Sequence, residues 1–184
     1  MDDREAVTRL QAGDLSGLEP LVRRYQGQAL RTAFLITQER ALAEEAVQEA
    51  FLRFYGAVRR FDADRPVAPY LLRIVVRTAL NLARRERRTV SLDGSMEQVE
   101  RLLARAEGVE EQVERAWLAA EVERALAALT PRQRAVIVQR YYLGLSEQEM
   151  ARRLDVTPGT VKRLLYNARR RLRRLLGPYE EGTP

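Results

Sequence analysis

The chain has 184 residues, of which 46% are apolar and 32% charged, and its formal net charge is +6. This length and composition are typical of a globular protein with one large domain or two small ones. Cysteine and histidine are absent, which excludes disulfides, thiol nucleophiles, imidazole bases and zinc fingers. No apolar run is long enough to span a bilayer and the N-terminus is charged, so we expect a cytoplasmic protein without membrane insertion.

Apolar residues recur at steps of three and four along most of the chain, and no stretch alternates as a strand would. We therefore expect an all-α fold. In the first half the pattern predicts helices at 2–12, 15–37, 40–58 and 67–88. Turn-forming residues separate these helices at Gly13-Asp14, near Thr37-Gln38 and at 61–66.

The helix at 40–58 has a predicted buried stripe of Leu42, Ala43, Ala46, Val47, Ala50, Phe51, Phe54 and Val58. Its other face carries Glu45, Gln48, Glu49, Leu52 and Arg53. A leucine among polar residues is compatible with a docking surface or with an isolated exposed side chain. Periodicity alone favours the isolated side chain.

The helix at 67–88 combines an apolar stripe with several arginines. Its predicted core residues are Tyr70, Leu71, Ile74, Val75, Thr78 and Leu82. Its cationic residues are Arg73, Arg77, Arg84, Arg85, Arg87 and Arg88. With the loop before it, this helix could hold single-stranded nucleic acid, and a solvated basic face explains the pattern equally well. Tyr70 fits a core position as well as a stacking platform.

Residues 89–95 lose the helical pattern, so we expect a domain boundary within 89–109. Ser95 and Gln98 could form a capping box for one short helix in this segment. Beyond it, N-cap signals at Thr130, Ser146 and Thr157 predict three further helices, the last two joined by a tight turn. That order is typical of a helix-turn-helix.

The two helices of this motif have complementary apolar faces. Met150, Ala151 and Leu154 can pack against Val161, Leu164, Leu165 and Ala168. The free face of the last helix then presents Gly159, Lys162, Arg163, Tyr166 and Arg170, and its start at Thr157 and Pro158 adds unpaired backbone amides. A recognition helix reads base edges in this way, so DNA binding is favoured over a plain helical bundle with a basic surface.

Charge is strongly segregated along the chain. Residues 59–88 hold nine basic and three acidic residues, 89–123 hold three and nine, and 124–177 hold thirteen and three. Two basic blocks separated by an acidic one suggest two modules that face a polyanion, although solvated helix faces would give the same count.

Three segments in this order carry a family resemblance: AEEAVQEAFLRFY (43–55), FDADRPVAPYLLRIVVRTALNLARRERR (61–88) and LTPRQRAVIVQRYYLGLSEQEMARRLDVTPGTVKRLLYNARRRL (129–172). Together they resemble bacterial RNA polymerase sigma factors of the extracytoplasmic-function (ECF) group. The resemblance implies sigma region 2 at 1–88, an acidic linker at 89–109, region 4 at 110–177 and a tail at 178–184. It implies two helical domains, no enzymatic activity and no cofactor.

The resemblance also implies partners and roles. Core RNA polymerase would be bound through the clamp helices of its largest subunit, by Glu45, Gln48, Glu49, Leu52 and Arg53, and through the flap of its second-largest subunit. Single-stranded minus-10 DNA would be held by Phe61, Asp62, Asp64, Arg65, Tyr70, Arg73, Arg77 and Asn81. Duplex minus-35 DNA would be read by Thr157, Pro158, Gly159, Lys162, Arg163, Tyr166 and Arg170. An anti-sigma factor is a further partner that the resemblance allows.

One alternative within nucleic-acid binding is a stand-alone transcriptional regulator with a LuxR-like helix-turn-helix. It would bind duplex DNA without polymerase, and it leaves the exposed face of the helix at 40–58 unexplained. A helical adaptor that binds only proteins would not need the basic block at 124–177.

Overall fold

The computed structural model describes residues 1–89 and 120–176, and the chain divides into two compact units, Met1–Thr89 and Val90–Pro184. All regular elements within the described ranges are helical, which confirms the predicted all-α class. Within the same ranges no helix is long and apolar enough to cross a membrane. The acidic linker and the short helix predicted from Ser95 lie outside the described residues.

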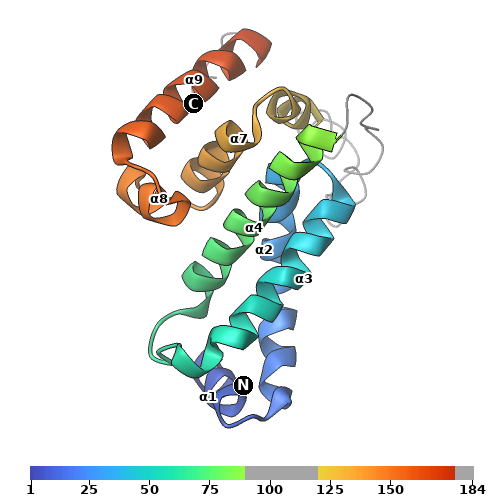
Figure 1. The fold of residues 1–184 in the computed structure, drawn as a ribbon, viewed down its shortest axis with the longest axis vertical. Coiled ribbons are helices and arrows are strands. Elements are labelled where there is room, and N and C mark those ends of the chain that lie inside the picture. The colour runs from blue at the N-terminus through green and yellow to red at the C-terminus, as the bar shows by residue number, and fades with distance from the viewer. Residues whose placement is uncertain (90–119, 177–184) are drawn as a thin grey trace, which may run out of the picture. The chain divides into compact units, whose positions relative to one another are not determined.

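The N-terminal unit is a bundle of three long helices with a short helix at one end (Figure 1). Its elements are α1 (Asp3–Gln11), η1 (Leu15–Gly17), α2 (Leu18–Thr37), α3 (Arg40–Ala57), η2 (Val58–Arg60) and α4 (Val67–Thr89). Helices α2, α3 and α4 all pack against one another, while α1 packs on η1 and α2. Leu21, Ile36, Phe54 and Leu71 are among the fully buried side chains of this core.

The predicted breaks between helices have clear local causes. Gly13 and Gln38 both adopt left-handed backbone conformations, with φ of 87° and 62°, and such a conformation ends a right-handed helix. The helix expected at 15–37 begins with the separate 3-10 turn η1, because Asp14 caps that turn by accepting a hydrogen bond from the Ser16 amide at 2.9 Å. The helix expected at 40–58 ends at Ala57 and continues as the 3-10 turn η2.

The predicted buried stripes of α3 and α4 are largely confirmed. Ala43, Ala46, Ala50, Phe51, Phe54 and Val58 are buried, as are Leu71, Val75, Thr78 and Leu82. The predicted members that are only half-buried are Leu42, Val47, Tyr70 and Ile74. These four lie at the margins of the stripes, where a side chain meets solvent as well as the neighbouring helix.

The C-terminal unit contains the helix-turn-helix. Residues 120–127 are helical and are followed by α7 (Pro131–Ile137), η4 (Val138–Tyr142), α8 (Glu147–Leu154) and α9 (Pro158–Leu176). Helices α7 and α8 both pack on α9. Met150, Ala151, Val161, Leu165 and Ala168 are buried as predicted, while Leu154 and Leu164 are half-buried.

Two of the predicted N-cap residues, Thr130 and Ser146, form capping boxes. The Thr130 hydroxyl accepts from the Gln133 amide and the Gln133 side chain accepts from the Thr130 amide, at 3.3 and 3.0 Å. Ser146 and Glu149 form the same reciprocal pair at the start of α8. Hydrogen bonds from Ser146 hold the pKa of the Glu149 carboxyl below its ordinary value. Two helix starts are thus fixed by side chains of the sequence itself.

The end of α7 differs from expectation, because η4 is a π-helical turn rather than a continuation of the α-helix. The Leu143 amide donates to the Val138 carbonyl at 3.0 Å, which is the wider π spacing. Gln139 is fully buried, and its side-chain amide donates to the Ala135 carbonyl at 3.1 Å. Apolar periodicity does not distinguish such a π turn from a continued α-helix.

Candidate polymerase and nucleic-acid interfaces

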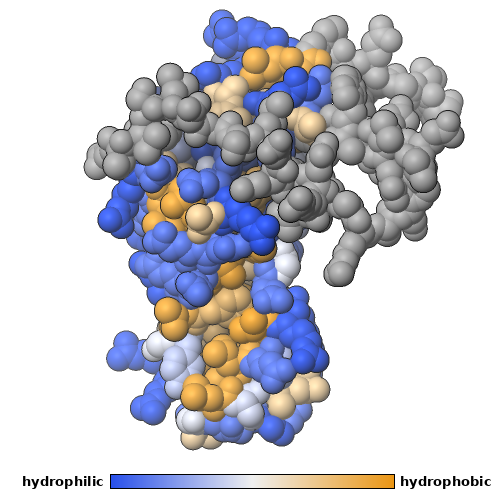
Figure 2. Space-filling model, turned by 90° about the vertical axis from the view of Figure 1, so that its right-hand side faces the viewer, coloured by the Kyte–Doolittle hydropathy of each residue, from blue (hydrophilic) through white to orange (hydrophobic). Residues whose placement is uncertain are grey.

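The outer face of α3 meets an apolar groove. Leu52 is 70% exposed, Glu45 and Gln48 are exposed, and Glu49 pairs with Arg53 one turn later. The groove, of about 1110 Å³, lies between α2 and α3, and its apolar lining includes Leu18, Val22, Leu30, Val47, Leu52 and Tyr55. Figure 2 shows an apolar strip along the N-terminal unit.

Leu52 is therefore not the isolated exposed leucine that periodicity favours. It belongs to a continuous apolar surface, and exposed surfaces of this kind are typical of protein-binding sites. Leu18, Val22 and Leu30 on α2 complete this surface. Sequence reasoning missed them, because the assignment of an apolar residue to core or groove depends on how α2 and α3 pack.

A second pocket, of about 800 Å³, opens where the loop 61–66 meets the start of α4. Five of the eight predicted minus-10 residues line it: Phe61, Asp62, Arg65, Tyr70 and Arg73. Arg60, Pro66 and Pro69 also line this pocket and were not singled out from the sequence. Aromatic rings beside several guanidinium groups are the combination that holds unpaired bases and their phosphates.

Three aromatic rings support the wall of this pocket. The Phe61 and Tyr70 ring centroids lie 5.1 Å apart, and the buried Phe54 ring lies 5.7 Å from Phe61 and 6.1 Å from Tyr70. Tyr70 thus belongs both to the edge of the core and to the pocket, so its two sequence interpretations are not exclusive. Edge and tilted contacts of this kind stabilise the orientation of each ring.

The other three predicted minus-10 residues lie elsewhere. Asp64 is on the loop but forms an ion pair with Arg4 of α1, at 3.3 Å. Asn81 lines a separate pocket of about 380 Å³ between α3 and α4, together with Glu49 and Arg53. Arg77 is exposed on α4 and lines neither pocket. The structure therefore does not bring Arg77 or Asn81 to the loop pocket.

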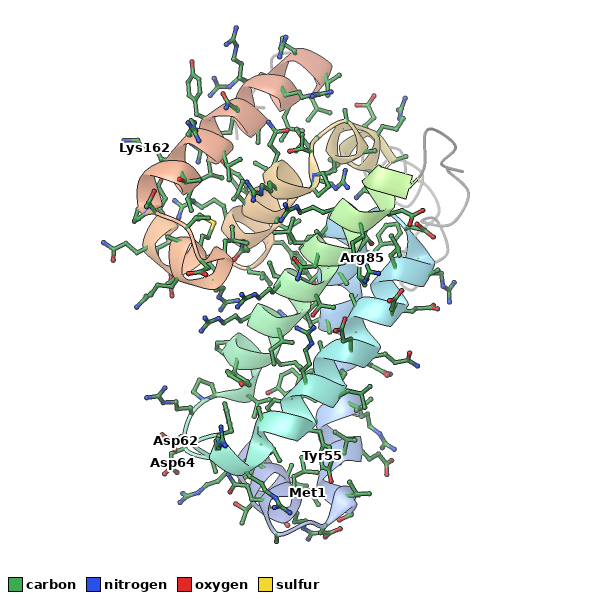
Figure 3. All side chains as sticks on the ribbon, viewed as in Figure 1. Met1, Tyr55, Asp62, Asp64, Arg85 and Lys162 are labelled. Carbon is green, nitrogen blue, oxygen red and sulfur yellow. The ribbon has the colours of Figure 1, made fainter. Side chains whose placement is uncertain are left out.

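The third surface is the free face of α9. All seven predicted minus-35 residues, Thr157, Pro158, Gly159, Lys162, Arg163, Tyr166 and Arg170, are exposed. Lys162 projects outward from the helix (Figure 3), and Tyr166 is 64% exposed. The preceding turn passes through Asp155, which adopts the left-handed conformation with φ of 56°. That turn sets α9 at an angle to α8, as in other helix-turn-helix motifs.

The three surfaces present cationic, aromatic and apolar side chains. Among the described residues no group of three or more acidic side chains could hold a metal ion. Arg169 donates to the Tyr141 hydroxyl at 2.8 Å, which ties α9 to the π-helical turn η4. The cationic side chains of the free face therefore lie on a helix that packs against α7 and α8 and is hydrogen-bonded to η4.

Comparison with known proteins gives matches to both units. Residues 21–89 match the family "Sigma-70 region 2" and residues 119–172 match "Sigma-70, region 4". The ECF RNA polymerase sigma factor SigM of Mycobacterium tuberculosis is 34% identical over 98% of this chain and 88% of its own length. The ECF sigma factor SigW of Bacillus subtilis is 26% identical over 94% of this chain and 96% of its own.

A solved structure of CnrH in complex with the cytosolic domain of CnrY is also similar, with 25% identity and a TM-score of 0.62 over 95% of this chain and 96% of that one. The two helical units and the sigma-70 regions define a transcription initiation factor. The chain belongs to the ECF group of the sigma-70 family, whose members bind RNA polymerase and promoter DNA. The stand-alone LuxR-like alternative is not supported, because region 2 is present as well as the helix-turn-helix.

Proposed function

We propose that the three surfaces divide the work of transcription initiation: the α3 face binds polymerase, the loop pocket captures a melted strand and α9 reads the upstream element. The observation that carries this proposal is the aromatic and cationic pocket lined by residues of the range 57–73, which shares a unit with the exposed Leu52. Such a factor acts without catalysis of its own, in the cytoplasm where bacterial RNA polymerase works.

The α3 face is the proposed binding site for the clamp helices of the largest polymerase subunit. The exposed Leu52 and the groove beside it support this assignment, because an amphipathic helix buries its apolar face in such a groove. Glu45, Gln48, Glu49 and Arg53 surround Leu52 with polar groups, as the rim of an interface does. The family's two-module organisation supports a further contact of the C-terminal unit with the flap of the second-largest subunit.

The loop pocket is the proposed site for an unpaired minus-10 base. Phe61 and Tyr70 offer ring faces, and Arg60, Arg65 and Arg73 offer charge for the neighbouring phosphates. Unstacking a base costs a few kcal/mol, and contacts that exist only with the single strand offset that cost. Melting by this route needs no ATP and no metal.

The free face of α9 is the proposed reader of the minus-35 element. Lys162 and Arg163 lie in the first turns of α9, where a recognition helix contacts bases, and the helix amides add phosphate contacts. Arg170 lies two turns further on and suits a phosphate contact. The solved complex of CnrH with the cytosolic domain of CnrY supports a further proposal, that this chain also binds a protein partner of the anti-sigma class.

The test is to add the purified chain to bacterial core RNA polymerase, transcribe fragmented genomic DNA of the source bacterium and sequence the transcript starts. We expect starts that share two short elements at a fixed spacing. Starts without shared elements, or none above core polymerase alone, would contradict the proposal. The mapped starts also define a promoter on which variants of the chain can be assayed.

A further inference from the structure

We propose that helix α1 is a positioning element for the strand-capture loop, with Gln11 and Arg4 as its two contact residues. The proposal rests on the proposed function of the loop 61–66, because α1 would fix the conformation in which that loop captures the strand. Neither residue lines the loop pocket. Both reach the loop from a helix about fifty to sixty residues earlier in the chain.

Gln11 fixes the start of the loop through its side-chain amide. Its Nε2 donates to the Phe61 carbonyl at 2.7 Å and to the Val58 carbonyl at 3.0 Å. An amide nitrogen carries two hydrogens, so both donors of Gln11 are used. These bonds join the end of α1 to the last turn before the loop.

The two bonds control the orientation of Phe61, which forms one wall of the pocket. The Phe61 amide donates to the Val58 carbonyl at 3.0 Å while its own carbonyl accepts from Gln11. The Phe61 backbone is therefore held on both sides, and its ring rests 5.1 Å from the Tyr70 ring. A wall fixed in this way is preorganised for the base, so less conformational entropy is lost on capture.

Arg4 provides a second contact, further along the loop. Its Nε lies 3.3 Å from the Asp64 carboxylate, and both side chains are largely exposed. Asp64 follows Asp62, whose carboxylate accepts from the Asp64 amide at 3.1 Å and pairs with Arg65 at 3.5 Å. Figure 3 shows Asp62 and Asp64 together on this loop. An exposed pair adds little stability, so we assign Arg4 an orienting role secondary to Gln11.

Helix α1 is itself firmly anchored, which a positioning element requires. Its Ala6, Val7 and Leu10 are buried, and Asp3 accepts hydrogen bonds from Arg24 and Tyr25 of α2. A Cβ at Gly17 would lie 2.2 Å from the Ala6 carbonyl oxygen, so η1 approaches α1 too closely for any other residue. The loop is therefore tied, through α1, to the rigid bundle.

The test compares Gln11→Glu, which keeps the shape but loses the donor, with Gln11→Lys, which keeps an N–H donor. Arg9→Ala is the matched control, because Arg9 also lies on α1 but pairs with Glu5 and not with the loop. Each variant is assembled with core polymerase on a promoter mapped from transcript starts. We measure promoter opening by the fluorescence of 2-aminopurine in the minus-10 region, and affinity for the single-stranded minus-10 oligonucleotide.

We expect Gln11→Glu to slow opening and weaken oligonucleotide binding about fivefold to tenfold, as loss of two hydrogen bonds predicts, with core affinity and upstream duplex binding unchanged. Gln11→Lys should recover part of the loss, Arg4→Ala should give a smaller loss, and Arg9→Ala none. Normal opening and oligonucleotide binding by folded Gln11→Glu would overturn the inference.

Failure of the inference is distinguishable from failure of the proposed function. If replacing 62–66 by a Gly-Ser linker impairs opening while Gln11→Glu does not, the loop captures DNA but α1 does not position it. If neither change affects opening, the assignment of the loop itself is wrong and the inference falls with it. An equal loss of core affinity in Gln11→Glu would show a merely structural role and also overturn the inference.

Discussion

Two adjacent side chains of α3 have different environments, one in the buried core and one at the proposed binding surface. Leu52 stands beside an apolar groove while Phe51, its neighbour in sequence, is buried. The α-helical period places them on different faces. Periodicity alone favoured an isolated exposed leucine, because a groove is formed by two helices and only the fold brings α2 to α3.

We expect Leu52→Arg to weaken binding to core polymerase by about 1–3 kcal/mol, because an apolar anchor at an interface is replaced by a charge. A core-binding titration with fluorescently labelled protein measures the change. Leu15→Arg is the control, since Leu15 is 60% exposed and does not line the groove. Equal affinities for the two folded variants would remove the α3 face from the docking site.

We expect Lys162→Ala and Arg163→Ala to weaken binding of the holoenzyme to duplex DNA that carries the upstream element. A residue that contacts phosphate should reduce the slope of log affinity against log salt by about one unit, while one that reads a base should relax preference at one position. Arg23→Ala makes the same charge change in the N-terminal unit. If both α9 variants match this control at every salt concentration and sequence, the recognition helix is assigned wrongly.

Tyr25 donates a hydrogen bond to Asp3 of α1, and its ionisation predicts how the stability of this contact depends on pH. Burial and the hydrogen bond to Asp3 raise the pKa of Tyr25 from 10.0 to about 12. Because the folded pKa lies above the unfolded one, the stabilisation is complete below pH 10 and is lost as pH rises toward 12. Spectrophotometric titration should show a late-ionising tyrosine that disappears in Tyr25→Phe. A late step that survives Tyr25→Phe would contradict this assignment.

At the scale of elements, the helix starts and ends were predictable because short-range chemistry sets them. Thr130 and Ser146 form capping boxes with residues three positions later, and Gly13 has a positive φ that prevents α1 from continuing. The π-helical turn η4 and the contact of Gln11 with Phe61 were not predictable. Apolar periodicity does not distinguish a π turn from an α-helical one, and a lone glutamine gives no signal of a partner fifty residues away.

The capping box at Thr130 predicts a measurable contribution to stability. Thr130→Ala should lower the free energy of unfolding of the C-terminal unit by about 1 kcal/mol, because the Gln133 amide loses its partner. Thermal unfolding followed by circular dichroism measures the shift in the full chain, and Thr130→Ser, which restores the hydroxyl, should recover most of it. An unchanged transition in Thr130→Ala would show that the box adds nothing to stability.

At the scale of the whole molecule, the distribution of charge along the chain matches the proposed roles of its segments. The basic blocks at 59–88 and 124–177 coincide with the capture pocket and the recognition helix, and residues 89–123 between them carry three basic and nine acidic residues. A polyanion attracts the two blocks and repels the segment between them. The order of the modules was evident from sequence, whereas Arg77 and Asn81, placed by resemblance with the minus-10 residues, lie outside the loop pocket.

The most direct test of this division is to replace residues 62–66 by a Gly-Ser linker and compare transcription from a fully paired promoter with transcription from one whose minus-10 region is held unpaired by mismatches. We expect strong impairment on paired DNA, partial recovery on unpaired DNA and unchanged binding to core polymerase and to the upstream element. Recovery is partial because the bubble removes the cost of opening but does not restore the lost pocket. Full activity of the variant on paired DNA would contradict this division.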